Sequence, residues 1–132
     1  MASFAALLML ALPLALAAQT PAPLSCPATL TPPGATGQGP AREFERINIY
    51  NGKPGGEEYD LAPDDQTEAR GKVTQWWFLK DYRSMNIFVR CRYRGTDAVT
   101  NLDVPAKYQK CSFTFQMDKK NNIIGKPEFS CK

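Results

Sequence analysis

The sequence of 132 residues contains no histidine. Its absence excludes Ser-His and Cys-His nucleophiles, a histidine general base and histidine-ligated zinc. Phosphate-binding glycine loops, dinucleotide-binding glycine motifs and C-x-x-C pairs are also missing. The serines beyond the N-terminal segment therefore have no imidazole to activate them. We expect a protein that is not an enzyme, with no catalytic residue, no metal ligand and no cofactor.

Apolar residues with a helical period are scarce, and no stretch of three helical turns shows them. The length allows one small domain, and 16 basic against 13 acidic residues give a net charge of +3. Short alternating runs of aromatic and β-branched residues instead predict strands. These runs lie at residues 44–50, 73–80, 86–94, 99–104, 111–117 and 123–131.

This pattern predicts a mainly β fold stapled by two disulfides, either a small antiparallel meander sheet or a partly open barrel. One or two short helical turns complete the prediction. Pro63 and Asp65, with Glu68 three residues later and Gly71 at the end, resemble a capped helical turn. Residues 105–110 are the second candidate for a single turn.

The N-terminal segment contains the one long apolar run, residues 4–16. This run is too short to cross a bilayer as a helix, which needs about 20 residues. Ala15 and Ala17 supply the small residues that precede a cleavage site, so we predict a signal peptide at residues 1–17. No Lys or Arg precedes the run, which departs from the usual leader pattern. We expect a periplasmic or secreted protein without a membrane span after cleavage.

The segment after the predicted leader is rich in proline. Six of the eleven prolines and three glycines lie between residues 20 and 40, a composition typical of an extended arm. We therefore divide the chain into a signal peptide (1–17), a proline-rich arm (18–42) and a β domain (43–132).

Four cysteines, an even number, indicate two disulfides in an oxidising compartment. A hairpin centred on Asn121 brings Cys111 opposite Cys131, at a separation that a disulfide can bridge. Cys26 and Cys91 are then left to pair with each other. Pairing of Cys26 with Cys131 and of Cys91 with Cys111 remains the alternative.

The candidate partner-binding surface follows from a predicted hairpin between residues 73–80 and 86–94, joined by a five-residue loop. With Lys80 facing Asn86, one face of this hairpin combines aromatic and basic side chains. They are Trp76, Phe78, Phe88, Arg90 and Arg92. Aromatic and arginine side chains are common anchors of protein interfaces. In the alternative, the guanidinium groups stack on these aromatics, or the acidic segment folds over them.

The acidic segment, residues 57–68, is the densest charge cluster. Its carboxylates belong to Glu57, Glu58, Asp60, Asp64, Asp65 and Glu68. Such oxygens suit calcium binding or acid/base catalysis, so a metal-dependent hydrolase is one alternative function. However, the spacing of a calcium loop is absent and Pro63 interrupts the run. A solvated loop is the favoured interpretation.

Several short motifs support a resemblance. They are Cys26-Pro27, Trp76-x-Phe78, Cys91-x-Tyr93, Val104-Pro105 and two late cysteines. With the leader, they resemble an uncharacterised family of small periplasmic four-cysteine proteins of Gram-negative bacteria. The chain is also similar, in size, disulfide use and β content, to periplasmic lysozyme inhibitors and to immunity proteins that neutralise secreted cell-wall effectors. The resemblance implies a periplasmic location and adds little about mechanism.

Together these features predict an exported, non-catalytic binding protein. We expect an inhibitor or immunity factor that acts on a protein of the cell envelope, with no nucleic acid partner. The alternatives are the metal-dependent hydrolase that uses residues 57–68 and a purely structural envelope protein.

Overall fold

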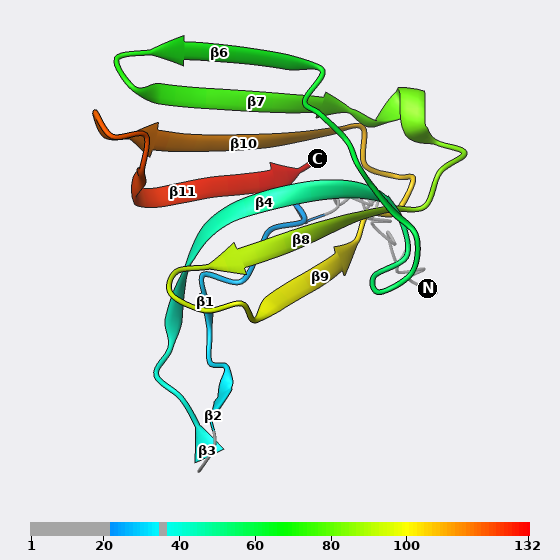
Figure 1. The fold of residues 1–132 in the computed structure, drawn as a ribbon. Coiled ribbons are helices and arrows are strands. Elements are labelled where there is room, and N and C mark those ends of the chain that lie inside the picture. Colours follow the sequence, from blue (N-terminus) through cyan, green and yellow to red (C-terminus); the bar gives the residue numbers. More distant parts are fainter. Residues whose placement is uncertain (1–21, 35–36) are drawn as a thin grey trace, which may run out of the picture.

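The computed structural model describes residues 22–34 and 37–132 (Figure 1). The first sheet contains β1 (Thr29–Leu30), β4 (Arg42–Gly52), β5 (Glu58–Asp60), β8 (Ile87–Tyr93) and β9 (Val99–Asp103). The second sheet contains β6 (Asp65–Ala69), β7 (Lys72–Phe78), β10 (Lys110–Met117) and β11 (Ile123–Cys131). β2 (Pro33–Gly34) pairs with β3 (Gly37–Gln38), and η1 (Leu79–Tyr82) is a 3-10 helix. The predicted mainly β, antiparallel fold is confirmed. The predicted signal peptide, residues 1–17, lies outside the described residues.

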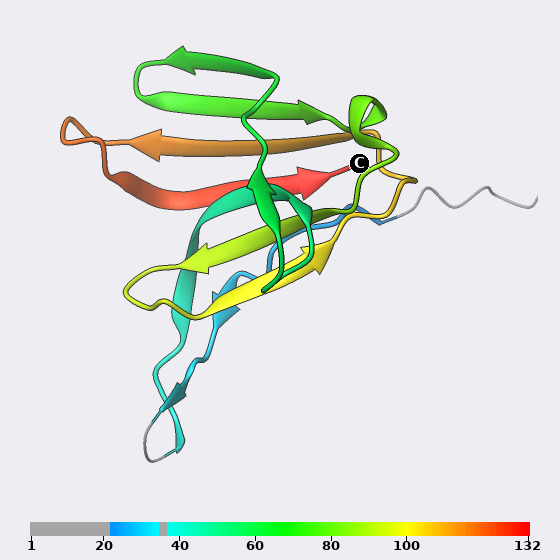
Figure 2. The ribbon, with the colours of Figure 1, turned by 45° about the vertical axis from the view of Figure 1, so that its right-hand side comes forward.

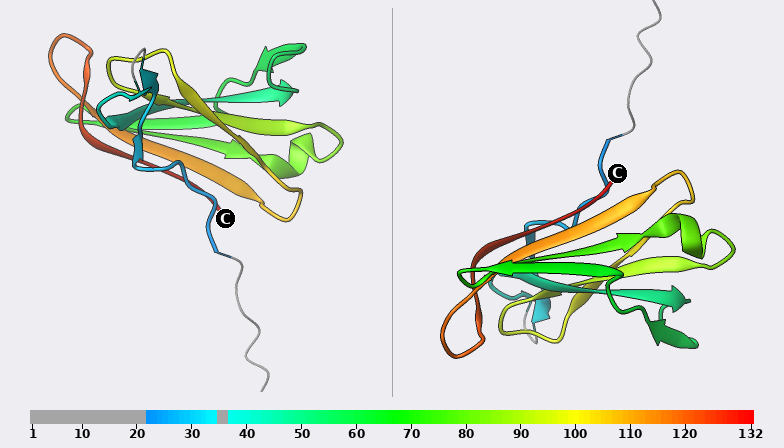
Figure 3. Two further views of the ribbon diagram at one scale, coloured as in Figure 1. Left: turned by 90° about the horizontal axis from the view of Figure 1, so that it is seen from below. Right: turned by 90° about the horizontal axis from the view of Figure 1, so that it is seen from above.

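The first sheet has the strand order β1–β4–β8–β9, with β5 also paired to β4, and the second has the order β11–β10–β7–β6. Figures 1 and 2 show the second sheet above the first, with β11 beside β4. The views from below and from above in Figure 3 show strands of one sheet projected across those of the other. Within the described residues, no helix is long and apolar enough to cross a membrane.

The core lies between the two sheets. Alternate side chains along a strand point to the same face of its sheet, and one face of each sheet packs against the other sheet. Ile49, Val89 and Cys91 contribute from the first sheet, and Trp77 and Phe113 from the second. All five are buried. The inner face of each sheet is thus settled, and the intervening residues of each strand lie on an outer face.

The predicted hairpin between residues 73–80 and 86–94 is wrong. β7 pairs with β6 and β10 in the second sheet, whereas β8 pairs with β4 and β9 in the first. Both edges of β7 are therefore occupied and offer β8 no partner. After Phe78 the chain turns into η1, where the Leu79 backbone N–H donates to the carbonyl oxygen of Gln109 at 2.9 Å. This 3-10 turn leads the chain out of one sheet and into the other.

The predicted helical turn near Pro63 is also wrong, because residues 65–69 form strand β6. Arg70 and Gly71, which link β6 to β7, both have positive φ values, 54° and 79°. Positive φ values at both central residues are typical of the tight turn in a two-residue β-hairpin loop. A Cβ atom on Gly71 would lie 2.8 Å from the carbonyl oxygen of Met117, so the position also lacks room for a side chain.

The other predicted helical turn, at residues 105–110, is a single reverse turn in which the Tyr108 N–H donates to the carbonyl oxygen of Pro105 at 3.1 Å. Helical structure among the described residues is confined to η1. This short helix occupies a segment that the residue pattern predicts to be the end of a strand and a loop.

The described part of the proline-rich arm connects the edges of both sheets. Leu24 exchanges two backbone hydrogen bonds with Cys131 of β11, and β1 pairs with the beginning of β4. The phenolic hydroxyl of Tyr93 donates to the carbonyl oxygen of Pro27 at 3.0 Å, which holds the arm against the first sheet. The predicted domain boundaries at residues 17 and 42 remain predictions.

The disulfides are Cys26–Cys91 and Cys111–Cys131, the pairing expected from the hairpin at Asn121. Cys111 and Cys131 lie directly opposite each other in the β10–β11 register. The Cys26–Cys91 bond fastens the arm to β8, which lies between β4 and β9 in the first sheet. One disulfide thus joins two strands of the second sheet, and the other attaches the arm to the first.

Candidate functional site

The five predicted partner-binding residues lie on two different outer faces. Trp76 and Phe78 belong to β7 and alternate with the buried Trp77, so they lie on the outer face of the second sheet. Phe88, Arg90 and Arg92 belong to β8 and alternate with buried residues on the outer face of the first sheet. The residues are separated because β7 and β8 belong to different sheets and do not form the predicted hairpin. The five residues do not form one surface.

Phe88, predicted from the sequence to lie on an exposed face, is buried, with 1% of its surface accessible. Its ring stacks on that of Tyr50, with centroids 5.1 Å apart and an interplanar angle of 21°. The guanidinium carbon of Arg90 lies 4.9 Å from the Tyr50 centroid and 5.5 Å from the Phe88 centroid. These contacts are the cation–π arrangement considered as an alternative.

The acidic segment supplies the cover over this aromatic pair. Both ends of the Arg90 guanidinium donate to Glu58 of β5, at 2.9 Å to Oε2 and 2.6 Å to Oε1. Arg90 Nε donates to the side-chain oxygen of Asn101 at 3.0 Å. A bidentate pair of this geometry fixes both side chains more firmly than a single contact does. Arg90 is therefore occupied within the fold.

The Arg90 contact also changes the titration of Glu58. Hydrogen bonds from the Arg90 side chain and then from the Gly55 backbone N–H stabilise the carboxylate and lower the pKa of Glu58 to about 2. The same carboxylate raises the pKa of Arg90. The Glu58 carboxylate is therefore ionised over the whole physiological pH range and remains paired with Arg90.

Arg92 lies beside this cluster in a second polar network. Its Nε donates to the side-chain oxygen of Asn48 at 2.8 Å, and Asn48 in turn donates to Asp60 at 3.2 Å. The outer face of the first sheet is therefore a linked set of polar side chains over two stacked aromatic rings.

The remaining carboxylates of the acidic segment point to separate partners. Asp64 accepts from the Phe78 backbone N–H at 2.7 Å and from the Tyr82 hydroxyl at 2.9 Å, and Asp65 accepts from the Gln66 N–H. Burial, followed by the contact with Asp64, raises the pKa of Tyr82. No group of three or more potential metal-ligating side chains occurs among the residues that the structure describes. These carboxylates act here as acceptors within the fold.

The outer face of the second sheet has no comparable cover in the described structure. Trp76 is half-buried, with Asp65 and Ser112 as its cross-strand neighbours, and Phe78 lies opposite Lys110. The hydroxyls of Thr74 and Thr114 hydrogen-bond at 3.0 Å beside them. This face is mostly polar, with two partly accessible aromatic rings.

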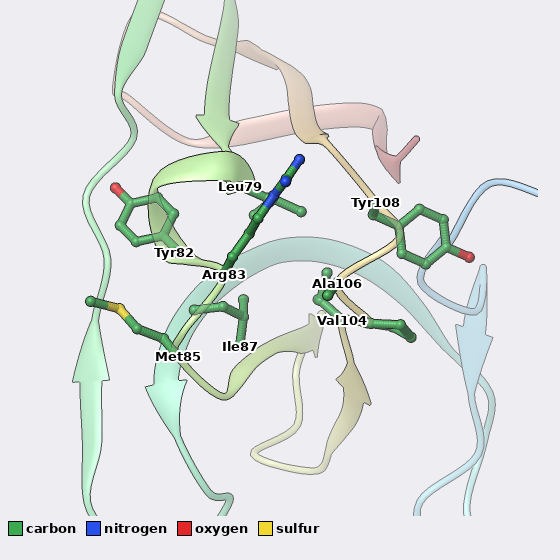
Figure 4. Close-up of a pocket in the computed structure, with 9 residues that line it drawn as sticks. Leu79, Tyr82, Arg83, Met85, Ile87, Val104, Ala106 and Tyr108 are labelled. Atoms are coloured by element: carbon green, nitrogen blue, oxygen red, sulfur yellow. The ribbon is translucent and has the colours of Figure 1, made fainter.

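A groove at one end of the molecule was not predicted from the sequence. It consists of two adjoining hollows, of about 560 Å³ and about 30 Å³, that share five lining residues. These are Met85, Ile87, Val104, Pro105 and Ala106. We call this surface the end groove, and Figure 4 shows its narrower part. The signal available in the sequence was Met85, an apolar residue within a polar loop, together with the Val104-Pro105-Ala106 run.

Three segments that are far apart in the chain form the end groove. They are the turn after β4, the η1–β8 connection and the loop after β9. In Figure 4, Tyr82 and Met85 lie on one side of the Arg83 side chain, and Val104, Ala106 and Tyr108 lie on the other. Only the tertiary fold brings these side chains together.

Comparisons with known proteins identify relatives of this chain. The model of a family described as Type VI secretion system Tli immunity protein matches residues 38–132, which include both sheets except β1. An uncharacterized 16.3 kDa protein from the trpG 5′ region of Azospirillum brasilense is 30% identical over 126 residues, covering 81% of this chain and 83% of that protein. No solved structure matches the chain significantly. On the family match, this chain belongs to the Type VI secretion system Tli immunity protein family.

Proposed function

We propose that this protein is a periplasmic immunity protein that binds a toxin delivered by a type VI secretion system and blocks it without catalysis. The observation that carries the proposal is the family match over residues 38–132. The matched region contains most of both sheets and the end groove, so the family resemblance covers the surfaces available for binding.

The proposed periplasmic location is supported by the two disulfides. Such bonds form and persist in oxidising compartments such as the bacterial periplasm, and are rare in the cytosol. Cys91, Cys111 and Cys131 are fully buried, so the two bonds are integral to the core. The leader predicted at residues 1–17 provides the route of export.

Inhibition by binding is supported by how the polar side chains are used. Glu58, Asp60 and Asp64 are each held by a hydrogen bond to a side chain or backbone group of the fold. A domain in which three loops meet at one end, as in the end groove, suits recognition of another protein. The predicted partner-binding residues contribute unequally to this proposal, since Phe88 and Arg90 serve the fold while Trp76, Phe78 and Arg92 remain near the surface.

A competition experiment tests the proposed function. The gene is deleted from the strain that carries it, and the deletion strain is grown with parental cells whose type VI apparatus is either active or disabled. We expect the deletion strain to be killed by active neighbours alone. A plasmid copy of the full gene should restore survival.

A second plasmid copy, without residues 1–17 of the predicted leader, separates the function from the location. We expect this copy to be produced but not to protect, because it stays in the reducing cytosol. Equal protection by the leaderless copy would contradict the periplasmic location. Survival of the deletion strain beside active parental cells would contradict the immunity function itself.

A further inference from the structure

The end groove contains accessible apolar side chains. Among the described residues, the large hydrophobic side chains with high exposure are Tyr59 at 60%, Met85 at 42% and Ile124 at 41%. Met85 lines the groove together with the buried Ile87. An accessible apolar patch with a polar rim is typical of an interaction site.

Tyr59 belongs to the same end of the molecule. In the register of the first sheet, Tyr59 of β5 and Ile87 of β8 both lie opposite Asn51 of β4, on its two sides. Cross-strand partners share a sheet face, so Tyr59 and Ile87 lie on the same face. Ile124 lies near the start of β11, by the β10–β11 turn, at the opposite end of the sheets in Figure 1. Of the three exposed apolar side chains, Met85 thus lines the groove, and Tyr59 lies on the same sheet face beyond β4 without lining it.

The rim of the end groove is cationic. Lys53 and Arg83 line it, and Lys107 lies beside it with its Nζ 5.2 Å from the centroid of the Tyr108 ring. The ion pairs in the described part of the chain are Glu45–Arg46 and Glu58–Arg90, so none of these three cations is paired there. Asp103 is the acidic residue among those that line the groove. The rim therefore favours a partner with carboxylates.

The cations of this rim differ from those of the predicted site. Arg90 and Arg92 are held by Glu58 and Asn48, so a partner would have to displace existing hydrogen bonds to reach them. Lys53, Arg83 and Lys107 require no such exchange within the described residues. Their positive field also speeds the approach of an acidic partner.

We propose that the end groove is the toxin-binding surface, and that it takes a segment of the toxin that presents apolar side chains flanked by carboxylates. This inference rests on the proposed immunity function. Met85 and Val104 contact the apolar side chains, and Lys53, Arg83 and Lys107 pair with the flanking acids. The Cys26–Cys91 disulfide fastens β8, which carries one of these loops and pairs with β4 and β9, which carry the other two, so the surface loses little entropy on binding.

The test uses two matched double variants in the competition assay described above. The groove variant combines Met85→Asp with Arg83→Glu, which removes apolar contact and reverses one rim charge. The control variant makes the same kinds of change at the opposite end, Ile124→Asp with Lys126→Glu. All four residues are exposed, so both variants are expected to keep the thermal midpoint and both disulfides.

We expect the groove variant to protect at least about tenfold less than the wild type, because apolar and charged anchors dominate interface energies. The control variant should protect like the wild type. Full protection by the groove variant would overturn the groove and leave the immunity function standing. Loss of protection with Trp76→Ala and Phe78→Ala instead would transfer binding to the outer face of the second sheet.

Two further outcomes test whether the toxin itself occupies the groove. If the purified wild-type protein is a dimer that the groove variant dissociates, a second copy occupies the groove and the inference is overturned. If the wild-type gene itself fails to protect the deletion strain, the proposed function falls and the inference with it.

Discussion

The outer faces of the two sheets contain similar residues but serve different roles. On the first sheet, Phe88 has 1% of its surface accessible under Arg90, which Glu58 holds with two hydrogen bonds. On the second sheet, Trp76 and Phe78 remain half-buried. The same alternation of aromatic and other residues thus produces a closed face in one case and a partly open face in the other.

The difference shows that a strand pattern defines two faces without defining what covers them. Glu58 lies 32 residues before Arg90 in the sequence. The two side chains meet because β5, which carries Glu58, and β8, which carries Arg90, both pair with β4. A covered aromatic stabilises the fold, whereas an uncovered one is available for contacts. Substitutions of Phe88 and of Trp76, which the sequence pattern groups together, should therefore change the free energy of unfolding by different amounts.

The largest effect is expected from truncation of the covered ring. Phe88→Ala should lower the free energy of unfolding by about 3–5 kcal/mol, because it leaves a cavity under Tyr50 and Arg90. Trp76→Ala should cost only about 1–2 kcal/mol, because part of the indole already contacts water. Urea unfolding of the oxidised proteins, followed by circular dichroism, measures both. Equal losses for the two variants would contradict the distinction between the faces.

The two disulfides allow the two sheets to be compared, because Cys26–Cys91 fastens the arm to the first sheet and Cys111–Cys131 joins two strands of the second. Removing either bond by paired Cys→Ala changes should cost about 2–5 kcal/mol. The Cys26–Cys91 bond closes a separation of 65 residues and the Cys111–Cys131 bond one of 20. The longer loop restricts the unfolded chain more, so its loss should cost about 1 kcal/mol more.

Thermal and urea unfolding of the two double variants test this order, with non-reducing electrophoresis to confirm that the remaining bond is formed. If removal of Cys111–Cys131 lowers the free energy of unfolding more than removal of Cys26–Cys91, strain in the native state or residual structure in the unfolded chain outweighs loop entropy.

The smallest effect concerns the pH dependence of the Glu58–Arg90 contact. The pKa of Glu58 is about 2 in the folded protein against an ordinary value of 4.5, so the folded state holds this proton less tightly. The stabilisation is complete above the ordinary pKa and is lost as the pH falls from 4.5 towards 2. Glu58→Gln should therefore unfold at a lower temperature than the wild type near neutral pH.

Thermal midpoints of the two proteins, measured between about pH 7 and pH 2, should converge at the acidic end. A constant difference across this range would show that the carboxylate charge of Glu58 does not stabilise the first sheet. Thr67→Ala on the exposed edge strand β6 provides a control that changes no titrating group.

The strand positions were predictable because they depend on local alternation. All six expected strands are present, and the β10–β11 hairpin has the expected Cys111–Cys131 register. The partners of β7 were not predictable from this alternation, since period-two patterns on residues 73–80 and 86–94 match each other equally well in many pairings. The Arg70–Gly71 turn was the missed signal, because it commits β6 to one edge of β7.

The candidate site shows the same division. Met85 and the Val104-Pro105-Ala106 run are visible in the sequence as isolated apolar residues near turns. Their assembly into the end groove depends on η1, which diverts the chain after β7, and on β8 joining the first sheet. Nothing local to either segment specifies the other.

Local chemistry alone determined the strand positions, the Cys111–Cys131 register and the lack of imidazole chemistry, because these properties depend on residue type and short spacing. Tertiary structure decided which aromatic rings are covered, which arginines are already paired and where loops from distant segments meet. The physical reason is that a strand edge accepts whichever partner buries the most surface at the lowest loop cost, and that choice involves the whole chain.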